Sequence, residues 1–94
     1  MAQAPETRCP VTEVATLLSD AWTMRIIYNL LKRKEMRFCE LERELEGIST
    51  RTLTLKLKRL EREKILKHRD TGYAITAHGM RLKSVIRAME HFGT

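Results

Sequence analysis

Residues 39–63 hold the feature that most restricts the fold, two short helical patterns separated by a tight turn. The pattern over 39–46 ends at Gly47, and glycine is favoured just beyond the end of a helix. Ser49 predicts the N-cap of a second helix over 50–63. Helix, short turn and helix in this order are typical of a helix-turn-helix unit.

The second of these helices is predicted to have an apolar stripe on one side and a basic face on the other. Leucines at i, i+4 and i+7 form the stripe, namely Leu53, Leu57 and Leu60. The opposite face carries arginine, lysine and an outward leucine but no acidic residue, whereas Glu61 and Glu63 lie to its sides. A basic helix face is often merely solvated, but a fully solvated face gains little from a leucine.

These residue types suit the major groove of DNA. Arginine bonds bidentately to guanine, leucine contacts a thymine methyl group, and lysine and threonine bind phosphates or base edges. The hydroxyls and amides at the start of the helix are also expected to bind a phosphate. The predicted DNA contacts on this segment are Ser49, Thr50, Arg51, Thr52, Leu55, Lys58, Arg59 and Arg62.

Two short extended runs, residues 65–69 and 73–76, predict a β-hairpin behind the second helix. Such a hairpin is a wing, and its Lys67 and Arg69 are predicted to contact a minor groove or a phosphate. The alternative is that both charges only keep an edge strand soluble.

The remaining elements complete the fold prediction. Helices are expected over 12–19, over 21–33 with Asp20 as N-cap, and from Thr76 to about Phe92, with a very short strand over 36–38. The fold class is therefore mainly α with a small β-hairpin (α+β), a winged helix-turn-helix. We expect an N-terminal tail over 1–9 and a single domain over 10–94.

The charge distribution points to a polyanionic partner. The net charge is +6, and residues 48–94 hold eleven Lys or Arg against four Asp or Glu, whereas residues 1–47 hold seven against eight. No apolar run approaches the roughly 18 residues of a membrane-spanning helix, and the chain starts without the apolar stretch of a signal peptide. Two cysteines are too few for a secreted disulfide scaffold, so we expect a cytoplasmic protein. From the basic charge we expect its partner to be nucleic acid and not membrane.

No arrangement typical of an enzyme is found. The three histidines show no metal-ligand spacing with either cysteine, and neither a phosphate-binding loop nor a nucleophile elbow is present. We therefore expect no catalytic activity, no cofactor and no bound metal.

In its helix-turn-helix and hairpin segments the sequence resembles the HxlR family, a branch of the MarR-like winged-helix regulators. The resemblance extends over the whole folded chain, and its landmarks are Cys9-Pro10, Trp22-Thr23, Arg37-Phe38-x-Glu40-Leu41, Gly47-Ile48-Ser49-x-Arg51-x-Leu53-Thr54, Leu57, Leu60-Glu61 and Tyr73-x-Ile75-Thr76-x-x-Gly79. It implies a homodimeric regulator of transcription acting on pseudo-palindromic DNA operators, with the first and last helices forming the dimer interface. The interface candidates are Leu17, Leu18, Val85, Met89 and Phe92, and the alternative is that they belong to the core of one chain.

The resemblance also implies a possible role for Cys9 in sensing oxidants. In some members similar to this chain, the cysteine that matches Cys9 senses oxidants or electrophiles; here Arg8 and a following helix start favour the thiolate. An inert thiol is the alternative. Two departures from the family are a wing shorter than usual, joined directly by Asp70-Thr71-Gly72, and a cysteine at position 39.

Two functions fit these observations. The first is a dimeric, sequence-specific regulator that binds double-stranded DNA and responds to an oxidant or small molecule. The second is a winged-helix interaction module that docks protein or RNA without reading DNA sequence. The basic, acid-free face of residues 51–62 favours the first.

Overall fold

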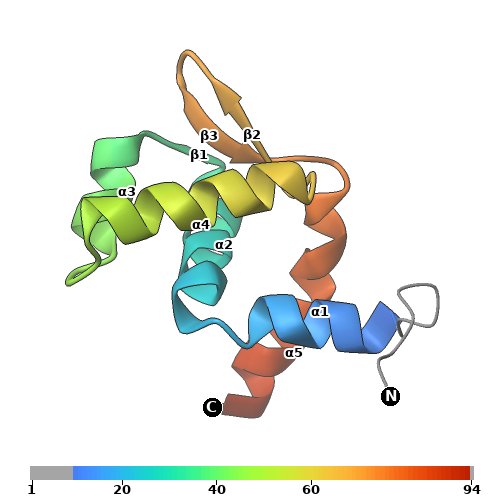
Figure 1. The fold of residues 1–94 in the computed structure, drawn as a ribbon. Helices are drawn as coiled ribbons and strands as arrows, with labels where there is room; N and C mark the ends of the chain where they lie inside the picture. Colours follow the sequence, from blue (N-terminus) through green and yellow to red (C-terminus); the bar gives the residue numbers. More distant parts are fainter. Residues whose placement is uncertain (1–9, 94) are drawn as a thin grey trace, which may run out of the picture.

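The computed structural model describes residues 10–93, which form five α-helices, one 3-10 helix and three strands (Figure 1). The tail predicted over 1–9 lies outside the described residues. In chain order the elements are α1 (Pro10–Leu18), α2 (Ala21–Arg33), β1 (Glu35–Met36), α3 (Phe38–Glu44), α4 (Thr50–Arg62), β2 (Leu66–Arg69), β3 (Gly72–Ile75), the 3-10 helix η2 (Gly79–Leu82) and α5 (Lys83–Gly93). The predicted fold class, mainly α with a small β-sheet, is confirmed.

Helix α2 is the centre of the fold. Asp20 caps its N-terminus as predicted, because the carboxylate accepts from the amides of Trp22 and Thr23 at 2.9 and 3.2 Å. Helices α1, α3 and α4 and strands β1 and β3 all pack against it. A helix surrounded in this way must be apolar on several sides, and Ile26, Ile27 and Leu30 are accordingly buried.

The hairpin of β2 and β3 is confirmed, with Arg69 opposite Gly72 and a turn at residues 70–71. A third strand joins it, because β1 pairs antiparallel with β3 and gives the order β1-β3-β2. The prediction of a strand over 36–38 was wrong at both ends, since β1 is Glu35–Met36 and Phe38 begins α3. The reason is that the Glu40 carboxylate accepts from the Arg37 amide at 2.8 Å, which starts the helix there.

The predicted helix-turn-helix is present over α3 and α4. Helix α3 ends at Glu44, two residues before the predicted end at 46, and Gly47 with φ +93° makes the turn. The Ser49 hydroxyl accepts from the Thr52 amide at 3.0 Å, which confirms Ser49 as the N-cap of α4.

The C-terminal helix begins differently from the prediction. The Thr76 hydroxyl does accept from the Gly79 amide at 2.9 Å, but the N-cap of the first turn is His78 and not Thr76 as predicted. The first turn is the 3-10 helix η2, however, and α5 starts only at Lys83. The Thr76 hydroxyl also donates to the Lys64 carbonyl at 2.5 Å, which ties the end of α4 to the start of the last helix.

One hydrophobic core joins these elements. Its buried members are Leu17, Ile26, Ile27, Leu30, Met36, Leu41, Leu45, Leu53, Leu57, Leu60, Ile65, Leu66 and Ile86. The three leucines of the predicted α4 stripe are thus all in the core. Within residues 10–93, no helix is long and apolar enough to cross a membrane.

Candidate DNA-binding surface

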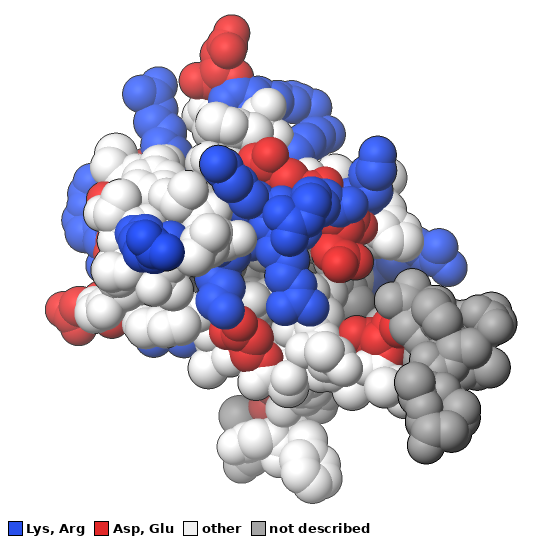
Figure 2. All heavy atoms as spheres, viewed as in Figure 1, with Lys and Arg blue, Asp and Glu red and all other residues white. Residues whose placement is uncertain are grey.

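The outward face of α4 carries exposed cations. Arg51, Lys58 and Arg62 are exposed, and none of them forms an ion pair with another described residue. Leu55 lies among them with 56% of its surface exposed. In Figure 2, which is viewed onto α4, lysine and arginine gather over this helix with acidic side chains beside them. The face therefore combines free cations with one apolar group.

The hydroxyl groups at the start of α4 are already engaged. Ser49 caps the helix and donates to the Thr52 hydroxyl at 2.9 Å, and the Thr50 hydroxyl donates to the Glu42 carboxylate at 2.5 Å. The predicted phosphate site is weakened by this arrangement, because the Thr52 amide is not free and Glu42 adds a negative charge next to Thr50.

Lys56 holds α4 against the start of α2. Its ammonium group forms an ion pair with the Asp20 carboxylate, and only 27% and 20% of these side chains are exposed. Burial raises the pKa of Asp20, but the hydrogen bond from Lys56, the bonds from the two capping amides and the lysine charge outweigh it and leave the pKa below its usual value. The sequence predicted only the capping role, since 36 positions separate the two residues.

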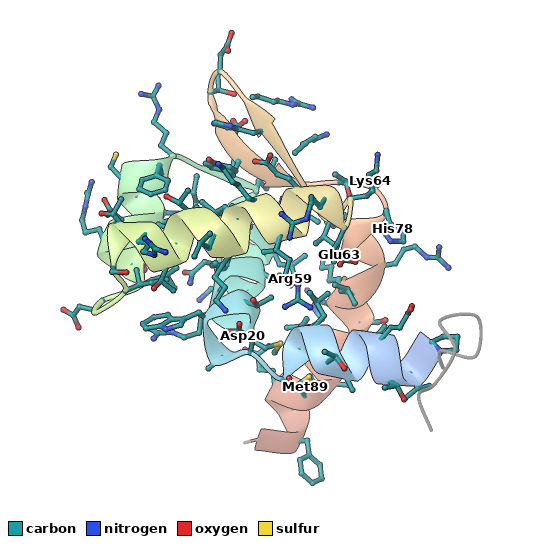
Figure 3. All side chains as sticks on the ribbon, in the orientation of Figure 1. Asp20, Arg59, Glu63, Lys64, His78 and Met89 are labelled. Atoms are coloured by element: carbon teal, nitrogen blue, oxygen red, sulfur yellow. The ribbon has the colours of Figure 1, made fainter. Side chains whose placement is uncertain are left out.

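Arg59 lies along the same edge of α4 as Lys56 and is half-buried. Figure 3 labels it on the last turns of the helix, together with Glu63 one turn later. Among the predicted cations of α4, Arg59 is therefore less exposed than Arg51, Lys58 and Arg62.

The wing places its two predicted cations on one face. Side chains alternate along a strand, so Lys67 and Arg69 share the side of β2 opposite to Leu66, which is buried. On the other side His68 stacks on Tyr73, with 4.0 Å between ring centroids. Burial, and secondarily the charge of Glu61, raises the pKa of Tyr73.

The hairpin is fixed to the body of the domain at its tip. The Thr71 hydroxyl donates to the Glu35 carboxylate at 2.7 Å. Gly72 has φ +140°, and a Cβ there would lie 2.8 Å from the Met36 carbonyl oxygen. A short wing with a tight glycine turn is thus packed directly on β1.

The predicted dimer candidates divide into two groups. Val85, Met89 and Phe92 of α5 are exposed, and Leu18 is half-buried. Leu17 is only 7% exposed and packs in the core of its own chain. We therefore correct the prediction for Leu17, whose apolar surface is already covered within one protomer.

The cysteines contribute less to this surface. Cys9 lies outside the described residues, and Cys39 is an exposed free thiol in the first turn of α3. The described part of the chain holds no cluster of three or more His, Cys, Asp or Glu suited to a metal ion.

Comparison with known proteins agrees with this geometry. Residues 17–94 match the family described as HxlR-like helix-turn-helix. The HTH-type transcriptional regulator sll1512 of Synechocystis sp. is 34% identical over 94 aligned positions, which cover 92% of this chain and 68% of the relative.

Two solved structures of regulators are also similar. Quinone-bound YodB of Bacillus subtilis superposes with a TM-score of 0.82 at 30% identity, covering 90% of this chain and 97% of YodB. The redox regulator HypR in its oxidised form gives a TM-score of 0.76 at 27% identity, covering 90% and 94% of the two chains.

Proposed function

The chain belongs to the HxlR-like helix-turn-helix family of transcriptional regulators, and from this premise we propose that it binds double-stranded DNA in a sequence-specific manner as a homodimer. The observation that supports this most is the outward face of α4, where exposed Arg51, Lys58 and Arg62 surround an exposed Leu55. This helix is the second of a helix-turn-helix, the element that enters the major groove in such folds.

Base reading falls on Arg51 and Leu55. Arg51 is in the first turn of α4, where recognition helices contact base edges, and it can bond to guanine with both guanidinium nitrogens. Leu55 lies one turn further along and contacts a thymine methyl group. The Ser49 and Thr50 hydroxyls donate within the chain, so they contribute phosphate contacts only where DNA displaces those partners. The Thr52 hydroxyl accepts from Ser49 and can still donate to a phosphate.

The other cations bind the DNA backbone. Lys58, Arg59 and Arg62 follow α4 toward its C-terminus, and Lys67 and Arg69 extend the positive surface onto the wing. Contacts of this kind fix the orientation of the protein without reading sequence. The short wing reaches a phosphate or the edge of a minor groove, whereas the recognition helix supplies most of the affinity.

Dimerisation allows two copies of α4 to read a pseudo-palindromic operator. The exposed apolar residues Val85, Met89 and Phe92 of α5, together with the half-buried Leu18 of α1, supply the surface. In a two-fold dimer of this class the half-sites are centred about 34 Å apart, one turn of DNA.

A response to oxidants is the regulatory part of the proposal. Similar regulators have been solved with quinone bound, after diamide treatment and in oxidised form. Cys9 follows Arg8 and precedes α1, a setting that stabilises a thiolate. Diamide should change operator affinity in the wild type and in Cys39→Ser but not in Cys9→Ser. An equal response of Cys9→Ser would exclude Cys9 as the sensor.

The central experiment selects bound sequences from a random duplex pool and then measures affinity by fluorescence anisotropy. We expect a palindromic site. If the dimer makes about 6–10 phosphate contacts, a plot of the logarithm of the binding constant against the logarithm of the salt concentration should have a slope of roughly −5 to −9. Arg51→Ala should cost about 1–3 kcal/mol and relax the preference at one base pair of each half-site.

Lys32→Ala is the matched control, because Lys32 is an exposed cation of α2 whose ammonium lies over the Tyr28 ring and not on the α4 face. It should leave the selected site and the affinity unchanged. Absence of salt-sensitive binding to any duplex at low ionic strength would refute DNA binding, and selective capture of RNA or a protein would then favour an interaction module.

A further inference from the structure

A groove runs between the C-terminal half of α2 and the first turns of α5. It has a volume of about 530 Å³, and none of its lining residues is a predicted DNA contact or dimer candidate. Pockets that hold small organic ligands measure about 300–1,000 Å³. By the helical period, Val85, Met89 and Phe92 lie on the side of α5 away from Lys83 and Arg87. A partner that packs on that row therefore does not have to cover the groove.

The groove has an excess of positive charge. Lys32 of α2 and Lys83 and Arg87 of α5 line it, against one acidic residue, Glu90. The Glu90 carboxylate already accepts from the Tyr28 hydroxyl at 2.7 Å. None of the three cations forms an ion pair with another residue in the described part of the chain. Three positive charges against one negative charge leave an excess of two.

This arrangement is unfavourable for the protein alone. Lys83 and Arg87 are four positions apart on α5, and like charges at this spacing destabilise a helix. The neighbouring groove of about 310 Å³ is balanced, because Arg25 and Glu90 are the charged residues that line it. The uncompensated charge thus belongs to the first groove, and a local conflict of this kind is typical of a functional site.

The same groove has an apolar part. Leu31 and Tyr28 are half-buried, Ile86 is buried, and all three contribute to the lining. The Lys32 ammonium lies over the Tyr28 ring, 4.9 Å from its centroid, which brings a cation to the border of this apolar surface. A bare inorganic anion would leave Leu31 and Ile86 in water, so the occupant has to combine an anionic group with an apolar body.

We propose that the groove binds a small organic phosphate monoester. Such a group carries a charge of about −1.5 to −2 at neutral pH and has three strong acceptor oxygens, which matches the excess of two positive charges. Arg87 can bond to two of these oxygens at once, while Lys32 and Lys83 act as point charges. The organic body of the ligand covers Leu31 and Ile86.

A ligand that joins α2 to α5 also bears on DNA binding. Helix α2 packs against α4, and the Thr76 hydroxyl ties the end of α4 to the start of the last helix. Bound ligand should therefore change operator affinity, and operator DNA should change ligand affinity by the same factor. This regulatory part rests on the proposed function, whereas the binding site itself does not depend on it.

Titration of the isotope-labelled full chain without DNA tests the site, with phenyl phosphate as the probe at about pH 7.5. Phenyl phosphate should bind at least about fivefold more tightly than phenyl sulfate, which has one charge fewer, and than inorganic phosphate, which lacks the ring. Nuclear Overhauser effects should connect the ring to the methyl groups of Leu31 and Ile86. Equal affinity for the three probes, or contacts to Leu55 of α4 instead, would overturn the proposal.

Variants of the cations provide the second measurement. Arg87→Gln should weaken phenyl phosphate binding at least about fivefold, because it removes a charged, bidentate donor. Arg81→Gln is the matched control, since Arg81 is an exposed arginine of η2 that does not line the groove, and it should change the affinity less than about twofold. Wild-type affinity in Arg87→Gln would contradict the site.

Operator binding separates the site from its coupling. Phenyl phosphate should change the operator affinity of the wild type about fivefold or more and leave that of Arg87→Gln unchanged. If the ligand binds in the groove but operator affinity stays the same, the coupling fails and the site stands. If the chain binds no DNA, the titration still decides the site. If Arg87→Gln weakens operator binding without any ligand, the groove holds a DNA phosphate and the proposal is wrong.

Discussion

The contact between Asp20 and Lys56 allows a quantitative test of how α4 is held against α2. One carboxylate performs two tasks, because its Oδ1 caps α2 through two amides and its Oδ2 pairs with Lys56 of α4. Loss of an N-cap costs about 1 kcal/mol, and loss of a largely buried ion pair of this kind about 1 kcal/mol more. Asp20→Ala should therefore lower the free energy of unfolding by about 2 kcal/mol.

Asp20→Asn separates the two tasks. An asparagine still caps the helix but carries no charge, so only the contribution of the pair, about 1 kcal/mol, should be lost. In a domain of this size that corresponds to a fall of about 4–8 °C in Tm. Lys56→Met, which keeps the apolar stem of the lysine, should cost a similar amount.

The assay is urea unfolding at a fixed protein concentration, applied to the two single variants and to their double variant. Because both substitutions remove the same interaction, the double variant should be no less stable than either single one. Lys58→Met is the matched control, an exposed lysine of α4 that should change stability by less than about 0.5 kcal/mol.

The pH dependence has a defined sign. The pKa of Asp20 is lower in the folded chain than in the unfolded chain, so the stabilisation is present above the unfolded pKa of about 3.9 and is lost as the pH falls through the folded value. The difference in stability between wild type and Asp20→Asn should be constant above about pH 5 and shrink below about pH 4. Equal stability of both proteins at neutral pH, or full additivity with Lys56→Met, would refute the coupling.

Two further predictions concern the C-terminal elements. A Cβ at position 79 would lie 2.5 Å from the Ile65 carbonyl oxygen, so Gly79→Ala should destabilise the fold by about 2 kcal/mol or more in thermal unfolding. Gly93→Ala is the control, because a Cβ there would have open space around it, and it should not destabilise the fold. Equal effects of the two substitutions would contradict the close approach at Gly79. The Tyr28 hydroxyl donates to Glu90 at 2.7 Å, and this bond raises the pKa of Tyr28, so Glu90→Gln should lower it in an ultraviolet titration. The contribution of this bond is present at neutral pH and is lost as the pH rises through the folded pKa; an unchanged titration would exclude the contact.

Much of the helix-turn-helix could be predicted from the sequence because its signals are local. The Ser49 cap, the Gly47 turn and the leucine stripe of α4 each depend on residues within a few positions of one another. The hydrogen bond of a cap and the 3.6-residue period of a helix are satisfied within one segment. The outward basic face follows from the same period, since the buried stripe fixes which side remains outside.

Element ends were predicted less well, and the reasons are specific. Residues 36–38 were expected to form a strand, but the Glu40 carboxylate accepts from the Arg37 amide and a helix begins at Phe38. The last helix was expected to begin directly after Thr76, yet its first turn is a 3-10 helix that holds Gly79 against Ile65.

The sequence by itself determined that this chain forms a helix with a basic outward face behind a short turn, with a β-hairpin after it. Only the tertiary structure decided that Leu17 belongs to the core, that Lys56 pairs with Asp20 across 36 positions, and that the Thr50 hydroxyl is taken by Glu42. The physical reason is that hydrophobicity and charge specify which faces of a helix are buried or solvated, but not which partner they meet. A leucine of a core and a leucine of an interface have the same chemistry, so only the packing of α1 on α2 could show that Leu17 is buried within its own chain.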